Sequence, residues 1–598
     1  MTEEAQSADF GPWNPGLNST IPQRFLPLST LYQPENTFTH LADAQELSDF
    51  TGLAEKDLVR FRPERLLVHE TLIRVMANLS VPDGSHYGDL GINFRSITDT
   101  ILAKHAAPKL PQIVQAFDEM RARAEALIIR ALDETVFRSP TPPSDQPEET
   151  PSFLQRLFFG AKASKPKPPA PAPDPLTAAL TQWTAERNKQ TNPEAQAALN
   201  ALIKTATAIA AKRGHLMGGK ELITQVALTF MCNGYGSELV GQMLEPIFNT
   251  AVEAEGFTPL PLQPKPVIMN VKGASAAGKS TLRPLQQKLA ARIGVNWQDF
   301  ALISPDIWRK YLLDYDTLGE ASKYAGMLTG HELEIIDKKL DRYMAAKAAD
   351  GQIPHLLIDR FRFDSFASPG GEAGGRLLTR FGDLVYMFFM ITPPEATVER
   401  AWGRGLEYGR YKAVDDLLDH NVEAYSGMPD LFFTWALNTK KKVHYEFLDN
   451  SVPKGTRPRT VAFGWNGEMT VFDIKCLLDV DRFAKINLGA ATPAEVYQVS
   501  ASMAPEDNTG FLKACGQRLA CLNLADPETG RIYAELNNGK LRWADQAVLD
   551  QQCKNAEIRA GIRALIPDLA ECASEGAERG SLLDQNSSHT LGQWSKAG

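Results

Sequence analysis

The chain has 598 residues, more than a single hydrophobic core usually holds, so we expect two to four domains. Hydrophobic residues make up 43% and charged residues 23% of the sequence, which is ordinary for globular proteins and excludes a wholly disordered or fibrous chain. The net charge of −9 argues against nucleic acid as the main partner, and no apolar run approaches the length that spans a membrane. We therefore expect small molecules or proteins as partners, and no membrane.

The beginning of the chain, residues 1–138, predicts an extended arm followed by a helical domain. Residues 1–40 are rich in Pro, Asn, Ser and Thr and show little periodicity, so we expect them to run over the surface. From Leu41 to Phe137, apolar residues recur at steps of three and four, which is typical of amphipathic helices. The first residues lack the pattern of a secretory signal, which predicts a cytoplasmic location, while export by a route without a cleaved signal stays open.

Residues 139–175 predict a linker, because closely spaced prolines favour extended chain and cannot build a core. Within this linker, Ser152–Phe159 is a short amphipathic segment with aromatic side chains that either docks on its own chain or serves as a partner or membrane anchor. Residues 176–263 return to an Ala-rich helical pattern and are expected to brace the domain that follows. The helical regions and the linker are the parts of the chain that could bind another protein.

Residues 264–485 predict an α/β domain. Apolar segments of strand length alternate with amphipathic helical stretches; they are Val267–Val271, Phe300–Ile303, His355–Ile358, Leu384–Ile391 and Val443–Leu448. This alternation predicts a mostly parallel sheet with helices on both faces. A hairpin is expected to turn at Asn466-Gly467. Residues 486–572 predict a small α+β appendage with a second hairpin at Arg531–Trp543, and residues 573–598 predict a disordered tail.

A loop after the first of these strands matches the pattern G-x-x-x-x-G-K-[ST] and is followed by a helical pattern. Small residues let consecutive backbone N–H groups curl around the phosphates of a nucleotide, and Lys279 can bridge its β- and γ-phosphates. The Ser280 hydroxyl is placed to bind Mg²⁺. ATP and Mg²⁺ are therefore the expected cofactors, bound by Gly273, Ala274, Ser275, Ala276, Ala277, Gly278, Lys279, Ser280 and Thr281.

Two carboxylates stand where parallel strands should end, Asp306 after the second strand and Asp359 after the third. Ligands of open α/β sheets lie at the carboxyl ends of the strands, so we expect both acids to converge on the loop. Asp306 is then the candidate base for an attacking hydroxyl, and Asp359 suits Mg²⁺ or substrate. The alternatives are a helix cap for Asp306 and an ion pair with Arg360 or Arg362 for Asp359.

A basic segment at Thr397–Lys412 could supply positive charge to a transferring phosphate. Arg400 and Arg404 are one helical turn apart, and a glycine-hinged loop with Arg410 follows them. Arginines on a mobile cover can reach the phosphate and exclude water. The alternative is a basic helix end that simply faces solvent.

Taken together, the segments GASAAGKST, LISPDIWR, HLLIDRFR and ERAWGRG resemble the zeta-toxin-like kinases, a group of P-loop kinases of bacterial toxin systems and secreted effectors. The resemblance covers about Lys265–Asp449. It implies transfer of phosphate from ATP to a hydroxyl of a nucleotide-containing metabolite, such as a UDP-N-acetylhexosamine or NAD. It also implies that Arg309 contacts substrate or phosphate and that Arg400, Arg404 and Arg410 belong to a lid. Where the family usually has Glu-Gly-Thr, this chain has Asp359-Arg360-Phe361, which we assign to the substrate side.

Two other functions remain open at this point. A nucleotide-gated interaction protein would bind ATP without modifying a metabolite, although no N-K-x-D guanine motif points to a GTPase-type switch. A kinase acting on nucleic-acid ends would need a basic groove beside Asp306, and the basic clusters in the sequence are Lys440–Lys442 and the arginine-rich cover.

Overall fold

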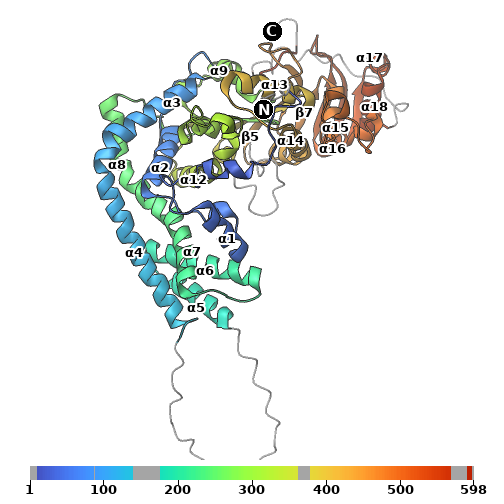
Figure 1. Ribbon diagram of the computed structural model, residues 1–598. Helices are drawn as coiled ribbons and strands as arrows, with labels where there is room; N and C mark the ends of the chain where they lie inside the picture. The colour runs from blue at the N-terminus through green and yellow to red at the C-terminus, as the bar shows by residue number, and fades with distance from the viewer. Residues whose placement is uncertain (1–9, 87, 139–174, 361–377, 568–588, 595–598) are drawn as a thin grey trace, which may run out of the picture. The chain divides into compact units, whose positions relative to one another are not determined.

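The computed structural model describes residues 10–86, 88–138, 175–360, 378–567 and 589–594 (Figure 1). The chain forms two compact units. One comprises residues 1–30, 71–105 and 248–598, and the other comprises residues 31–70 and 106–247. The predicted Pro-rich linker at 139–175, with its segment Ser152–Phe159, lies outside the described residues except for Pro175, which begins a helix.

The smaller unit is helical. Its helices are α1 (Leu41–Thr51), α4 (Leu110–Glu134), α5 (Pro175–Lys189), α6 (Pro193–Arg213) and α7 (Lys220–Met231), with parts of α2 (Pro63–Asn78) and α8 (Ser237–Glu255). Helix α4 packs against α6 and α7, because its apolar stripe, including Ile113, Phe117 and Met120, is buried there. The helical regions predicted before and after the linker therefore join in one unit, while residues 71–105, with α3 (Asp89–Thr100), belong to the larger one.

The larger unit is built on one ten-stranded sheet in the order β10-β9-β8-β7-β6-β5-β4-β1-β3-β2. The five predicted strands are confirmed as β1 (Val267–Lys272), β2 (Phe300–Ile303), β3 (His355–Ile358), β4 (Leu384–Ile391) and β5 (Lys442–Asp449). They pair in parallel throughout. Nearly all of their residues are buried, which explains why the sequence shows continuous apolar runs there.

The second half of the sheet is largely antiparallel and consists of β6 (Arg459–Trp465), β7 (Glu468–Val471), β8 (Cys521–Ala525), β9 (Ile532–Asn537) and β10 (Lys540–Ala544). Both predicted hairpins are present, as β6–β7 and β9–β10. The parallel pair β7–β8 joins the predicted α+β appendage to the α/β domain. The appendage therefore continues the same sheet instead of forming a sheet of its own.

Helices connect and cover the strands of this sheet. They are α9 (Arg283–Arg292), α10 (Arg309–Leu312), α11 (Ala325–Leu328), α12 (Gly330–Ala349), α13 (Pro394–Tyr408), α14 (Val414–Ala436), α15 (Ile474–Phe483), α16 (Gly510–Arg518), α17 (Gln546–Gln552) and α18 (Ala556–Leu565). Helix α14 packs on β5, α15 on β4 and β6, and α16 on β8. Short 3₁₀ turns add η6 (Lys279–Leu282), η8 (Pro305–Trp308), η9 (Gly319–Tyr324) and η14 (Pro505–Asn508).

Two terminal segments differ from their predictions. The described part of the arm, residues 10–30, belongs to the larger unit and buries Pro15 and Leu17, so it is packed and does not simply run over the surface. Within the predicted disordered tail, Leu591 is 1% and Trp594 7% exposed. Trp594 stacks on Phe463 and Phe472, a contact that composition alone does not reveal. None of the helices in the described part of the chain is both long and apolar enough to cross a membrane.

Candidate functional site

The loop between β1 and α9 contains the predicted nucleotide-binding residues, and its two glycines are required by close packing. A Cβ on Gly273 would lie 2.8 Å from Cβ of Met390 in β4. Gly278 has φ +97°, and a Cβ there would lie 2.4 Å from Nδ2 of Asn450. Only glycine fits both the conformation and the space at position 278. The glycines of the motif are therefore explained by the fold at this point.

The carbonyl oxygen of Ala277 fixes the loop to the neighbouring strands. It accepts hydrogen bonds from Thr392 Oγ1 (3.1 Å), Asn450 Nδ2 (2.7 Å) and Arg400 Nη1 (3.3 Å). Arg400 also donates from Nη2 to the carbonyl oxygens of Asn450 (2.6 Å) and Val452 (3.2 Å). The structure thus places Arg400 as a support of the loop. Thr392 and Asn450 were not predicted for the site, and their only sequence signal is their position directly after β4 and β5.

Lys279 lies at the centre of the site. Its Nζ donates to the carbonyl oxygens of Gly273 (3.1 Å) and Ala274 (3.0 Å). Burial lowers the pKa of Lys279, and the negative charges of Asp359 and Asp306 oppose that shift, while Arg404 adds to it. Electrostatic coupling between side chains falls off with distance, so these residues lie near one another. Lys279 follows β1, Asp306 follows β2 and Asp359 follows β3, so all three come after the carboxyl ends of neighbouring parallel strands.

Asp306, in η8, is held by two arginines. Its Oδ1 lies 2.9 Å from Arg309 Nε and its Oδ2 lies 2.9 Å from Arg410 Nη2. Desolvation raises the pKa of this carboxyl, but the charges of Arg410 and Arg309 outweigh it and hold the pKa well below its usual range. The side chain of Asp306 is nevertheless 50% exposed, so a ligand can approach it.

Arg309 has a second set of contacts that fixes its guanidinium. Its Nη1 donates to the carbonyl oxygen of Gly326 and to Thr329 Oγ1, the latter at 3.0 Å. These residues lie at the junction of α11 and α12. Arg309, which the resemblance assigned to substrate or phosphate, therefore forms an ion pair with Asp306 through Nε and is held by α11 and Thr329 through Nη1.

The two residues after β3 separate in function. The backbone N–H of Asp359 donates to the carbonyl oxygen of Ile303 at 2.9 Å, which keeps Asp359 beside the end of β2. Arg360 is buried, and its guanidinium contacts Asp337 Oδ1 at 2.5 Å and Asp341 Oδ1 at 2.8 Å, both in α12. Asp359 therefore lies beside the end of β2, whereas Arg360, expected on the substrate side, is taken up by an internal ion pair that joins β3 to α12. The suggested partner Arg362 lies outside the described residues.

Residues 409–413, which we call the covering segment, connect α13 to α14 and carry Arg410 onto Asp306. Lys412 in this segment lies 3.3 Å from Asp416 Oδ2 and contacts His420 Nδ1. Burial lowers the pKa of Lys412 to about 8, and burial together with the Lys412 and Lys279 charges lowers the pKa of His420. A neutral His420 then accepts a hydrogen bond from Lys412. Sequence reasoning missed this cluster, although its four-residue spacing was a usable signal.

The oxygen-bearing side chains fit a magnesium ion that is bound together with phosphates. Mg²⁺ prefers oxygen ligands and commonly uses only one or two protein groups beside water and substrate phosphates. Ser280 and Asp359 are partly buried and supply a hydroxyl and a carboxylate, while both oxygens of Asp306 contact arginines. Within the described ranges, no group of three or more His, Cys, Asp or Glu side chains is arranged to hold a metal ion.

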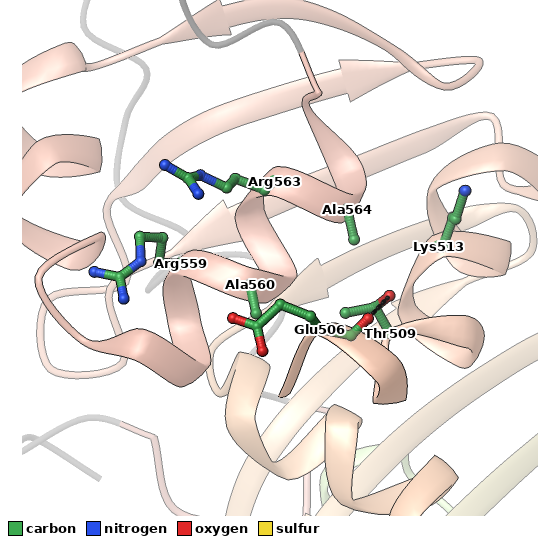
Figure 2. Close-up of a pocket in the computed structure, with 7 residues that line it drawn as sticks. All are labelled: Glu506, Thr509, Lys513, Arg559, Ala560, Arg563 and Ala564. Atoms are coloured by element: carbon green, nitrogen blue, oxygen red, sulfur yellow. Dashed lines mark hydrogen bonds between the residues drawn. The ribbon is translucent and has the colours of Figure 1, made fainter. Parts of the chain in front are cut away.

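A separate hollow of about 240 Å³ lies between η14, α16 and α18 and contains none of the predicted residues. Figure 2 shows Arg559 and Arg563 side by side on α18, with Lys513 on α16 across from them.

Comparison with known proteins adds no assignment, because no protein-family model and no curated protein matches the chain.

Proposed function

We propose that the protein is an ATP- and Mg²⁺-dependent kinase that phosphorylates a hydroxyl of a small, nucleotide-containing metabolite, as the resemblance to zeta-toxin-like kinases implies. One observation supports this most: Lys279, in a loop of the phosphate-binding pattern, shares its surroundings with Asp306, Asp359 and Arg404 at the carboxyl ends of parallel strands. A nucleotide-binding loop, an acid and arginines are the parts that phosphoryl transfer requires.

In this mechanism the loop 273–280 binds the phosphates of ATP, and Lys279 leaves the carbonyl oxygens of Gly273 and Ala274 to contact the β- and γ-phosphates. Arg404 and Arg410 neutralise charge on the transferring group. Ser280 and Asp359 would hold Mg²⁺, which supplies further positive charge to the phosphates when bound. Arg400 acts indirectly, because its hydrogen bond to Ala277 keeps the loop in place.

Asp306 orients the acceptor hydroxyl and takes its proton late in the reaction. While both arginines contact it, the low pKa of Asp306 makes it a weak base, and loss of one arginine raises that pKa; a loose transition state needs little deprotonation before the bond to phosphorus forms. The hydroxyl reaches a carboxylate oxygen by displacing Arg410 or Arg309, and a displaced Arg410 is then available to the γ-phosphate.

The test compares three variants. Lys279→Ala is expected to lower ATP affinity at least about a hundredfold, because a lysine in contact with phosphates contributes roughly 3 kcal/mol or more. Lys288→Ala is the matched control. Lys288 is exposed on α9, the helix that follows the loop, and the variant should bind ATP normally. Asp306→Asn should bind ATP with unchanged affinity but turn over at least about a hundredfold more slowly. Full turnover by Asp306→Asn would contradict the mechanism.

A nucleotide-gated binding protein is the second candidate, and the two arginines on Asp306 favour it, since they leave neither carboxylate oxygen without a cationic partner. This candidate predicts ATP binding without transfer to any metabolite. Binding that is abolished by Lys279→Ala, combined with the absence of a phosphorylated product, would select it. The kinase acting on nucleic-acid ends remains a third proposal and predicts transfer to an oligonucleotide.

A further inference from the structure

The N-terminal arm, here residues 10–30, packs directly against the covering segment. Leu17, with Ile21 and Phe25, lies in one apolar cluster with Tyr411 and Ala413. The same cluster includes Leu313, Tyr324 and Leu328, from elements that follow Asp306 in the chain. The covering segment is therefore enclosed between the arm and the elements after β2.

Lys323, in η9, fastens the arm to the covering segment. Its Nζ donates to the carbonyl oxygen of Pro15 at 2.8 Å. The same Nζ lies 3.5 Å from the ring centre of Phe10 and 5.7 Å from that of Tyr411. Burial lowers the pKa of Lys323, as expected for an ammonium surrounded by rings and backbone. Gly16 permits this arrangement, since a Cβ at its φ of +72° would lie 2.7 Å from Lys323 Nζ.

The arm also contacts the two helices that flank the covering segment. Ser19 Oγ donates to Asp415 Oδ2 in the first turn of α14. Trp13 packs against a cluster that contains Val398 and Ala401 of α13 and Leu417 of α14. Ala276 of the glycine loop packs against this cluster as well. The arm thus touches the covering segment and both of its ends.

The covering segment also contacts the two helices that it connects, since Lys412 lies 3.3 Å from Asp416 Oδ2 of α14 and the Tyr411 ring centre lies 5.6 Å from that of Trp402 in α13. It begins at Gly409, whose φ of +70° ends α13, and Tyr411 packs so closely on Gly405 that a Cβ there would lie 2.3 Å from the ring. The segment positions Arg410, whose side chain is 18% exposed, on Asp306. We propose that the N-terminal arm, fastened by Lys323, positions Arg410 at the site, and that this arm is part of the catalytic unit. The proposal rests on the kinase function proposed above.

Limited trypsin digestion tests whether the arm holds the covering segment in place, and it needs no kinase activity. Arg410 and Lys412 are trypsin sites with side chains only 18% and 16% exposed, so the wild-type segment should resist cleavage. Lys323→Met removes the hydrogen bond and both ring contacts, and cleavage after Arg410 and Lys412 is expected to accelerate about tenfold or more. Lys323→Arg should restore most of the protection. Arg24→Ala is the matched control, because this arm residue pairs with Glu320 of η9 and the two side chains are 71% and 81% exposed, so the pair contributes little.

Enzyme kinetics test whether the position of Arg410 that the arm maintains contributes to catalysis. Lys323→Met should lower kcat about tenfold while the KM for ATP stays within about twofold, because Arg410 loses its position while the glycine loop is untouched. Lys323→Arg should recover kcat, and Arg24→Ala should match the wild type.

Unchanged trypsin cleavage in Lys323→Met would overturn the proposal, and so would faster cleavage with an unchanged kcat. A melting temperature near that of the wild type excludes general unfolding as the cause of faster cleavage. For a variant that fails to fold, Ser19→Ala removes a different contact of the arm and is judged by the same two measurements. If the wild type transfers no phosphate at all, the kinase proposal fails, and the trypsin comparison still decides whether the arm holds the segment.

Discussion

At the scale of single residues, the glycine positions of the loop were predictable, and the internal partners of the nearby arginines were not. The motif at 273–280 is local in sequence, so its residue types alone indicated a phosphate-binding turn. The roles of Arg360 and Arg400 depend on Asp337, Asp341 and the carbonyl oxygen of Ala277, which are distant in the chain. A charged side chain near a motif does not reveal whether it faces a ligand or an internal partner.

Gly278→Ala tests the backbone explanation of the motif. Gly278 has φ +97°, and a Cβ at this position would lie 2.4 Å from Asn450 Nδ2. Both facts disfavour any side chain, so we expect the melting temperature and the ATP affinity to fall. The backbone strain alone corresponds to about 1–3 kcal/mol. Gly403→Ala is the control, because it lies in α13 with no heavy atom within 4 Å of a Cβ, and it should stabilise the protein by about 1 kcal/mol. Equal effects of the two substitutions would contradict this explanation.

At the scale of elements, the five parallel strands were predictable because burial on both faces makes each one a continuous apolar run. The packed segment His589–Trp594 was not predictable, since it is short, lies in polar sequence and is held by long-range contacts. Glu446 in β5 accepts hydrogen bonds from the backbone N–H groups of Leu591 (2.7 Å) and Gly592 (2.9 Å). A buried acid in a strand thus anchors the end of the chain.

The pH dependence of stability tests this anchor. Burial raises the pKa of Glu446 to about 7 from 4.5, although its hydrogen bonds and Arg457 oppose the shift. A raised pKa means that the folded state binds the proton more tightly, so the contribution of Glu446 is full below pH 4.5 and is lost as the pH rises to about 7. The loss amounts to about 3 kcal/mol.

Urea unfolding of wild type and Glu446→Gln between pH 4 and 8, a range set by that linkage, measures the effect. Glu446→Gln cannot titrate, so the difference in unfolding free energy between the two proteins should shrink as the pH rises from 4.5 to about 7. The amide nitrogen cannot accept a hydrogen bond, whereas both oxygens of a protonated carboxyl can, which makes the variant the less stable protein at acid pH. A difference that does not change with pH would contradict the assigned proton.

At the scale of the whole molecule, the α/β class was predictable and the extent of the sheet was not. The pair β7–β8 connects Glu468–Val471 with Cys521–Ala525, two short strands that are far apart in sequence. The sequence pattern of neither strand indicates which other strand it pairs with. The same limit applies to residues 71–105, which a helical pattern assigned to the N-terminal domain but which belong to the larger unit.

Truncation tests the continuity of the sheet. A chain that ends at Lys485 lacks β8–β10, leaves β7 unpaired on one side and removes α16 and α18 from α15, so we expect the larger unit not to fold cooperatively. A chain that ends at Pro567 keeps the whole sheet and should still unfold cooperatively, at a lower temperature because it loses the packing of Leu591 and Trp594. Thermal unfolding followed by circular dichroism distinguishes the two. A cooperative transition of the shorter chain at an unchanged temperature would show that the appendage is a separate domain.

The most direct measurement is phosphate transfer itself. Wild-type protein, Lys279→Ala and Asp306→Asn are incubated with γ-labelled ATP, Mg²⁺ and a metabolite extract, and labelled small molecules are identified. We predict a labelled product with the wild type only, carrying the phosphate on a hydroxyl of a nucleotide-containing metabolite. Binding of ATP without any labelled product across nucleotides, nucleotide sugars and dinucleotides would contradict the kinase function.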